Sequence, residues 1–124
     1  MRPIDRTVWY VESHLNWAMS LDDIATVAGV SKFALTRAFF ATTGHTVLAY
    51  ARARRLSEAA RSLQSGGPRI LDVALSVGYA SHEAFSRAFR DHFGLSPVEV
   101  RCGRRPLPLT EAIDMSSDPS RPAF

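Results

Sequence analysis

Apolar residues recur every three or four positions through most of the first hundred residues, which is the spacing of one face of an amphipathic helix. The first such segment begins behind Pro3, a residue suited to a first helical turn. We expect a single amphipathic helix across this segment. Its apolar face comprises Ile4, Val8, Val11, Leu15 and Met19.

Serine and glycine residues delimit the next two predicted helices. Ser20 can cap a short helix over about 21–28, and Gly29 supplies the turn after it. Ser31 can cap a third helix, which stops at Gly44. The residues expected to face inward are Ile24, Ala25 and Ala28 in the short helix and Leu35, Ala38 and Phe39 in the third.

A longer helix is predicted over about 46–65, and it would pack on both halves of the chain. Gly66-Gly67-Pro68 breaks it, and a short helix over about 70–77 follows. Ser81 then caps a further helix that Gly94 ends, and a last short helix reaches from Ser96-Pro97 to about Cys102. The apolar positions are Leu48, Leu56, Ala59, Ala60 and Leu63 in the long helix and Ile70, Val73, Ala74, Val77, Phe85, Ala88 and Phe89 after it.

The two halves of the chain repeat one another. Upstream of the capping serines the spacing is 49, pairing Gly29 with Gly78, so the second copy carries one extra turn residue. A duplicated helix-turn-helix explains the pattern, and two such units could enter successive major grooves roughly 34 Å apart. A monomer would then read an asymmetric site. The pairs at a spacing of 50 are Ser31 and Ser81, Ala34 and Ala84, Arg37 and Arg87, and Gly44 and Gly94.

The outward side of the second helix in each unit is a candidate DNA-reading surface. Arg37 and Arg87 occupy equivalent outward positions, so we expect each to contact a base or a phosphate. A bidentate contact from arginine to guanine would contribute roughly 1–3 kcal/mol of discrimination. The candidate residues are Lys32, Phe33, Thr36 and Arg37 in the first copy and His82, Glu83, Ser86, Arg87 and Arg90 in the second.

The aromatic and acidic members of these surfaces have more than one interpretation. Phe33 is either a core aromatic or a contact for a thymine methyl group, whereas Phe40, on the same side, is expected to pack against the long helix. Glu83 can accept from a cytosine N4 amine, hold Arg87 at i+4, or stabilise the helix dipole. For His82, a base contact, a phosphate contact and a solvated position all stay open.

Four arginines make the predicted long helix basic: Arg52, Arg54, Arg55 and Arg61. Some are expected to be solvated or paired, as Arg54 can pair with Glu58 at i+4. We expect Arg52 to contact phosphate, which would add affinity and salt dependence but no sequence information.

Composition narrows the class of function. The 124 residues, of which 46% are hydrophobic, suffice for one domain or for two small ones that share a core. The net charge of +3 and the sequence pI near 9.6 come almost entirely from arginine, whose planar fork matches phosphate and the guanine edge. Nucleic acid is therefore favoured over a membrane as the partner, and no stretch approaches the ~20 apolar residues of a membrane span.

With Cys102 as the single cysteine, no disulfide framework is expected and the cytoplasm is the natural compartment.

Catalysis is not expected, and neither is a cofactor or a metal. The four histidines are scattered without metal-ligand spacing, and no glycine-rich phosphate loop or nucleophile motif is present. The rival to DNA binding is a helical module that binds RNA or another protein. That alternative predicts no site-specific binding to duplex DNA.

A long run in the second half carries a family resemblance. The sequence from Gly78 to Arg90, followed by Phe93-Gly94-Leu95-Ser96-Pro97 and Arg101, resembles the signature of AraC/XylS-type transcription regulators. The resemblance covers about residues 4–101. Three further segments resemble the MarA, SoxS and Rob subgroup: Ser31-Lys32-Phe33, Thr43-Gly44-His45 and Arg52-Ala53-Arg54.

The resemblance implies an all-α, bilobal domain of about seven helices over residues 1–103. Its two helix-turn-helix units, at about 21–44 and 70–94, would be joined by a long central helix at about 46–65. It also implies a bacterial, cytoplasmic transcription activator that binds double-stranded DNA as a monomer and has RNA polymerase as a partner. By position, Phe33, Thr36 and Arg37 fall on the first reading helix, and His82, Glu83, Ala84 and Arg87 on the second.

Departures from the family pattern put in doubt which DNA sequence is recognised, and they do not affect the expected fold. Phe33 stands where the subgroup often has tryptophan, Val100 where the family usually has tyrosine, and His82-Glu83 replaces uncharged amides. Residues 104–124 are expected to be a linker or tail, since 116–122 are rich in serine, proline and aspartate. Within it, 107–113 resemble the segment that in Rob-like relatives leads to a small-molecule-binding domain. Two alternatives stay open: a stand-alone DNA-binding protein regulated by its abundance, as in MarA and SoxS, and a longer protein in which such a domain supplies effector control.

Overall fold

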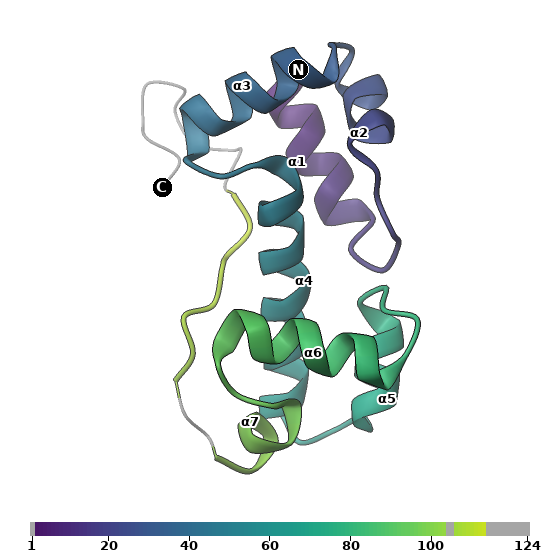
Figure 1. The fold of residues 1–124 in the computed structure, drawn as a ribbon, viewed down its shortest axis with the longest axis vertical. Coiled ribbons are helices and arrows are strands. Elements are labelled where there is room, and N and C mark those ends of the chain that lie inside the picture. Colours follow the sequence, from purple (N-terminus) through teal and green to yellow (C-terminus); the bar gives the residue numbers. More distant parts are fainter. Residues whose placement is uncertain (1, 104–105, 114–124) are drawn as a thin grey trace. The chain divides into compact units, whose positions relative to one another are not determined.

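The computed structural model describes residues 2–103 and 106–113, and within these ranges the chain forms seven α-helices and no strand (Figure 1). The all-α class expected from the sequence is confirmed. The helices are α1 (Pro3–Ser13), α2 (Leu21–Ala28), α3 (Lys32–Thr43), α4 (Val47–Gln64), α5 (Ile70–Ser76), α6 (His82–Phe93) and α7 (Pro97–Gly103).

The described residues group into two compact units. Unit 1 contains residues 2–14, 19–51 and 112–113, and unit 2 contains 15–18, 52–103 and 106–111. The helix α4 begins in unit 1 and continues in unit 2. Its first turn and its remainder therefore contribute side chains to different cores.

In unit 1, α1 packs against α2 and α3, and α2 packs against α3. The helix α1 ends at Ser13, so the expectation that it continues through Leu15 and Met19 is wrong. His14 leaves the helical region at φ −127° and ψ 29°, and its ring Nδ1 donates to the Tyr10 carbonyl oxygen at 2.8 Å. The buried apolar residues of this unit include Val8, Val11, Ile24, Ala25, Ala28, Leu35, Phe39, Val47, Tyr50 and Ala51.

Two residues expected in the core are exposed instead. Leu48 is 43% exposed, because Val47 and Tyr50 face inward in the first turn of α4 and Leu48 lies about 100° around the helix from Val47. Ala38 is also exposed. In α3 the buried positions follow a strict i+4 step, Leu35, Phe39 and Thr43, and Ala38 lies outside that line.

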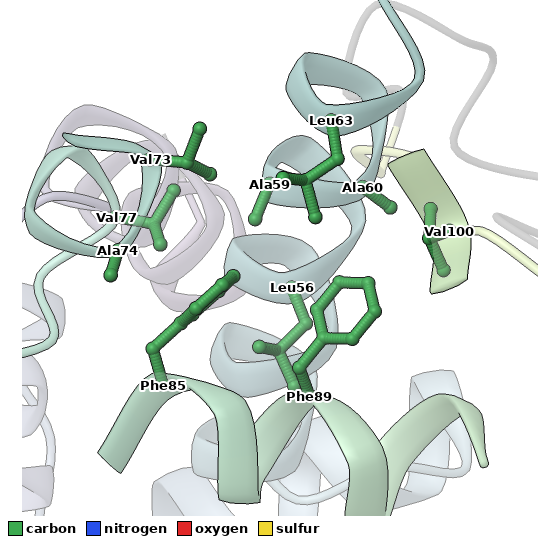
Figure 2. Packing of buried hydrophobic residues seen from close by; sticks show 10 residues of the cluster. All are labelled: Leu56, Ala59, Ala60, Leu63, Val73, Ala74, Val77, Phe85, Phe89 and Val100. Atoms are coloured by element: carbon green, nitrogen blue, oxygen red, sulfur yellow. The ribbon is translucent and has the colours of Figure 1, made fainter. Parts of the chain in front are cut away.

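The core of unit 2 is built around aromatic rings of α6 (Figure 2). The ring centroids of Phe85 and Phe89 lie 5.5 Å apart, and Tyr79 and Phe93 extend the series at 5.6 and 4.8 Å. Ala88 is half-buried against this cluster. The buried members are Leu56, Ala59, Ala60, Leu63, Val73, Ala74, Val77, Phe85, Phe89 and Val100.

The repeat seen in the sequence reappears in the backbone. The hydroxyl of Ser31 accepts from the Ala34 N–H at 3.1 Å, and Ser81 accepts from the Ala84 N–H at the same distance. Each capped helix, α3 and α6, ends at a left-handed glycine. The caps and stops predicted for these two helices are therefore confirmed.

One glycine is required for space as well as for its backbone angle. Gly78 has φ +88°, and a Cβ placed there would lie 3.1 Å from the carbonyl carbon of Asn16. The loop between α1 and α2 thus passes directly over the turn between α5 and α6. Both the angle and the contact exclude a side chain at this position without strain.

Residues 106–111 are attached to α4, which the sequence analysis did not predict. The Thr110 N–H donates to Ser57 Oγ at 2.8 Å, and Arg54 donates to the Thr110 carbonyl oxygen at 2.8 Å. Leu107 and Leu109 pack against the core of unit 2. The serine- and proline-rich residues 116–122 lie outside the described part of the chain.

Among the described residues, no single helix is both long and apolar enough to cross a membrane. Only α2 and α3 taken together reach that length and apolar composition, and they are bent by 84° relative to each other.

Candidate nucleic-acid interface

The second helix of each repeat, which is α3 in the first and α6 in the second, buries one side and exposes the other. Leu35 and Phe39 are buried in α3, as are Phe85 and Phe89 in α6. The candidate DNA-reading residues lie away from these positions. Lys32, Phe33, Arg37, His82, Glu83, Arg87 and Arg90 are exposed, and Thr36 and Ser86 are half-buried.

Arg37 and Arg87 correspond across the repeat, and both are exposed. Neither guanidinium forms an ion pair within 4.0 Å among the residues that the structure describes. Both fork-shaped groups can therefore bind an outside acceptor without breaking an internal contact, which is the condition for a bidentate contact to guanine or phosphate.

The other polar groups of α3 are partly engaged. The Lys32 ammonium lies 3.7 Å from Oδ1 of Asp22 and 5.8 Å from the centroid of the Phe33 ring. The hydroxyl of Thr36 donates to the Lys32 carbonyl oxygen at 2.8 Å. Since its proton is used in this way, the Thr36 oxygen is left as an acceptor at the surface.

Two phenylalanines project from α3 toward solvent. Phe33 is 72% exposed, which rules out the interpretation that it is a core aromatic. Phe40 is 56% exposed, so the expectation that it packs against the long helix is wrong. It lies seven residues after Phe33 and three after Arg37, and this spacing already placed it on the same helix face.

An open hollow of about 800 Å³ lies on this face of α3. It brings together the four candidate residues of the first repeat with three that the sequence analysis did not include in the site: Leu21, Phe40 and Ala41. The added residues are all apolar. For Phe40 and Ala41, the signal in the sequence was their helical spacing from Phe33. Leu21 comes from the preceding helix, α2.

In α6, Glu83 makes no ion pair within 4.0 Å with Arg87 or with any other described residue. The structure therefore does not support the interpretation that Glu83 holds Arg87 in place. Glu83 lies in the first turn of α6, where a carboxylate stabilises the helix dipole. His82 Nδ1 lies 3.5 Å from Ser86 Oγ, so these two side chains adjoin on one face.

Three of the four arginines of α4 are held by internal partners. Arg54, only 5% exposed, pairs with Glu58 at 3.0 Å, as predicted. Arg61 bonds both Glu58 and Glu111. The Arg55 guanidinium donates to the Trp17 carbonyl oxygen.

Arg52 differs from the other three because it is exposed and no described residue bonds its side chain. Its charge lies near α6, since burial and the nearby Arg52 together lower the pKa of His92. Arg52 is thus a cation of α4 that is available to a phosphate.

Among the described residues, no group of three histidine, cysteine or acidic side chains could hold a metal ion.

Comparisons with known proteins connect this geometry to one family. Residues 24–102 match the family described as a helix-turn-helix domain. The transcriptional regulator Rob of Salmonella typhimurium is 43% identical over 97 residues, which is 78% of this chain and 33% of Rob. The regulatory protein SoxS of the same organism is 35% identical over 98 residues, covering 79% of this chain and 92% of SoxS. The chain thus spans about a third of Rob and nearly all of SoxS.

Solved structures show the same fold. A transcriptional regulator of Chromobacterium violaceum, described as an AraC-type DNA-binding domain protein, superposes with a TM-score of 0.74 at 32% identity, covering 82% of this chain and 91% of that one. The DNA-binding domain of AdpA, a global transcriptional factor solved with a target DNA, gives a TM-score of 0.77 at 27% identity. That match covers 85% of this chain and 95% of the AdpA chain.

Proposed function

The chain belongs to the AraC-type family of helix-turn-helix proteins, and from this membership we propose that it binds specific double-stranded DNA sequences and regulates transcription. The observation that carries the proposal is the pair of equivalent, exposed arginines, Arg37 and Arg87, each on a serine-capped helix and neither in an ion pair with another described residue. The similarity to the AdpA domain, which was solved with its target DNA, supports the same function.

In this proposal α3 and α6 each enter a major groove. Arg37 and Arg87 bind guanine edges bidentately, and Thr36, Ser86, His82 and Glu83 face neighbouring base edges. Lys32, Arg90 and Arg52 contact phosphates, which position the protein and add salt dependence without reading sequence.

The proposal includes the architecture of the regulator. Residues 1–103 constitute the DNA-binding domain, with helix-turn-helix units at about 21–44 and 70–94. One chain carries both reading helices, so it binds as a monomer in the cytoplasm and, as an activator, works with RNA polymerase.

The first test is selection of bound duplexes from a random DNA library, followed by affinity measurements across a salt series. Enrichment of an asymmetric site that spans two adjacent major grooves is the expected result. A palindromic site would instead indicate a dimer. Binding to all duplexes alike, with a steep salt dependence, would contradict sequence-specific recognition and favour an RNA- or protein-binding module.

The second test uses two substitutions at each arginine. Arg37→Ala and Arg87→Ala should each weaken binding to the selected site by about 5- to 150-fold, with the loss in a different half of the footprint. The matched variants Arg37→Lys and Arg87→Lys keep the charge and lose the planar fork. If the lysine variants bind as tightly and as selectively as the wild type, the arginines contact only phosphate and the base-reading role is wrong.

A further inference from the structure

The two reading helices have the same backbone design and different surface chemistry. Both carry an arginine at the same repeat position, and both bury two apolar side chains on the opposite side. The residues around the arginine differ in kind. Phe33, Phe40 and Ala41 of α3 correspond, at the spacing of 50, to Glu83, Arg90 and Asp91 of α6.

The exposed apolar side chains of α3, Phe33 and Phe40, are not needed for folding. Charged residues occupy the equivalent positions of α6, where the helix nevertheless buries Phe85 and Phe89 completely. In α3, by contrast, Phe33 and Phe40 remain 72% and 56% exposed around the open hollow. Large exposed apolar groups that the fold does not require are typical of a binding surface.

The cations beside these rings indicate which partner fits. Lys32 and Arg37 line the same hollow, so its apolar surface adjoins two positive charges. DNA offers the complementary arrangement in its major groove, where the thymine C5-methyl is an apolar group presented between two rows of phosphates. A protein partner that filled the hollow by apolar contact alone would leave these charges unmatched.

We propose that α3 reads thymine methyl groups through Phe33 and Phe40, on either side of the base pair that Arg37 contacts. This inference rests on the proposed DNA-binding function and specifies the half-site. The two phenylalanines are seven residues apart, which is about 10 Å along a helix. With base pairs about 3.4 Å apart, they match methyl groups separated by about three steps. The α6 half-site is read through polar groups and does not depend on methyl groups.

Deoxyuridine provides a direct test, because it lacks only the methyl group of thymine and keeps the hydrogen-bonding edge. The duplex enriched from the random library would be synthesised with deoxyuridine in place of thymine, one position at a time, in each half-site. Affinities for the wild type are expected to fall about fourfold per contacted methyl group in the α3 half. In the α6 half, the same replacement should leave affinity unchanged.

Variants of the two phenylalanines link the effect to named side chains. Phe33→Ala and Phe40→Ala should each bind the thymine duplex more weakly and lose sensitivity to deoxyuridine at one position. Because both side chains are exposed, these variants should keep the helical circular dichroism and melting temperature of the wild type. The double variant Phe33→Glu with Phe40→Arg gives α3 the chemistry of α6, and library selection with it should lose the thymines of the α3 half.

The outcomes separate this inference from the function on which it rests. If no duplex is enriched from the library, the proposed DNA-binding function itself fails. If a site is enriched but binds equally well with deoxyuridine in the α3 half, DNA binding stands and the thymine reading is wrong. Unchanged DNA affinity of both alanine variants would also overturn it, and would assign the hollow to a protein partner.

Discussion

The phenolic oxygen of Tyr50 lies 2.9 Å from Oε2 of Glu12 and donates a hydrogen bond to it, although 38 residues separate the two in sequence. The same oxygen accepts from the Ile113 N–H at 3.1 Å. Tyr50 is only 2% exposed. One buried hydroxyl therefore joins α1, the first turn of α4 and the segment that follows α7 within unit 1.

Removal of this hydroxyl should lower the stability of unit 1. Tyr50→Phe keeps the ring in the core but leaves the Glu12 carboxylate and the Ile113 N–H without this partner. We expect the free energy of unfolding to fall by about 1–3 kcal/mol, since one of the lost bonds is to a charged group. Urea denaturation followed by circular dichroism measures the change.

Tyr10→Phe is the matched control for this prediction. Tyr10 also lies in unit 1, and its ring stacks on that of His14 with the centroids 4.1 Å apart, a contact that phenylalanine preserves. Equal losses in the two variants would show that the Tyr50 hydroxyl contributes nothing specific.

Gly78→Ala should destabilise the protein more than Gly94→Ala does. Both glycines are left-handed, at φ +88° and +76°, so each substitution carries about 1–2 kcal/mol of backbone strain. At Gly78 the added methyl group would also press on the Asn16 backbone, whereas nothing lies within 4 Å at Gly94. Thermal melting of the two variants compares them, and identical melting temperatures would contradict the packing argument.

Arg52 and Arg54 lie two residues apart on α4, and their substitution should affect different properties of the protein. Arg52→Ala should weaken DNA binding, reduce the salt slope of log K by about 1, and leave stability unchanged. Arg54→Ala should lower the free energy of unfolding by about 1–3 kcal/mol, because the Thr110 carbonyl loses its donor. Glu58 keeps its bond to Arg61, which limits the loss.

Salt-dependent binding and urea denaturation of both variants test this contrast. A stability loss in Arg52→Ala, or an unchanged salt slope, would remove Arg52 from the phosphate contacts.

Stability should decline at alkaline pH in a way that depends on Tyr79. Burial raises the pKa of Tyr79 above its usual 10.0, while the charges of Arg55 and Arg52 act to lower it. The unfolded chain therefore loses this proton first as the pH rises. Tyr79 has its full stabilising effect below pH 10.0 and loses it as the pH passes through the raised value.

Urea denaturation at intervals from pH 8 to pH 11 measures the effect. Tyr79→Phe should flatten the decline above pH 10, with the titration of the other groups remaining. A decline of the same steepness in both proteins would assign the effect to other residues.

Features that depend on neighbours in sequence could be predicted from the sequence. The capping serines and stop glycines of α3 and α6 act within three or four residues, so their roles follow from local chemistry. The pair between Arg54 and Glu58 is likewise one helical turn apart. The duplication itself, and the equivalence of Arg37 and Arg87, are visible as a fixed spacing.

Other features depended on which distant segment packs where, and only the tertiary structure decided them. The apolar period of the first segment did not reveal that α1 ends at Ser13. Hydrophobicity suggested that Leu48 and Phe40 are covered, yet the packing of α3 and of the first α4 turn leaves both exposed. A side chain's burial is set by the surfaces that meet it across the fold, and a spacing along one helix defines a face without specifying what lies against it.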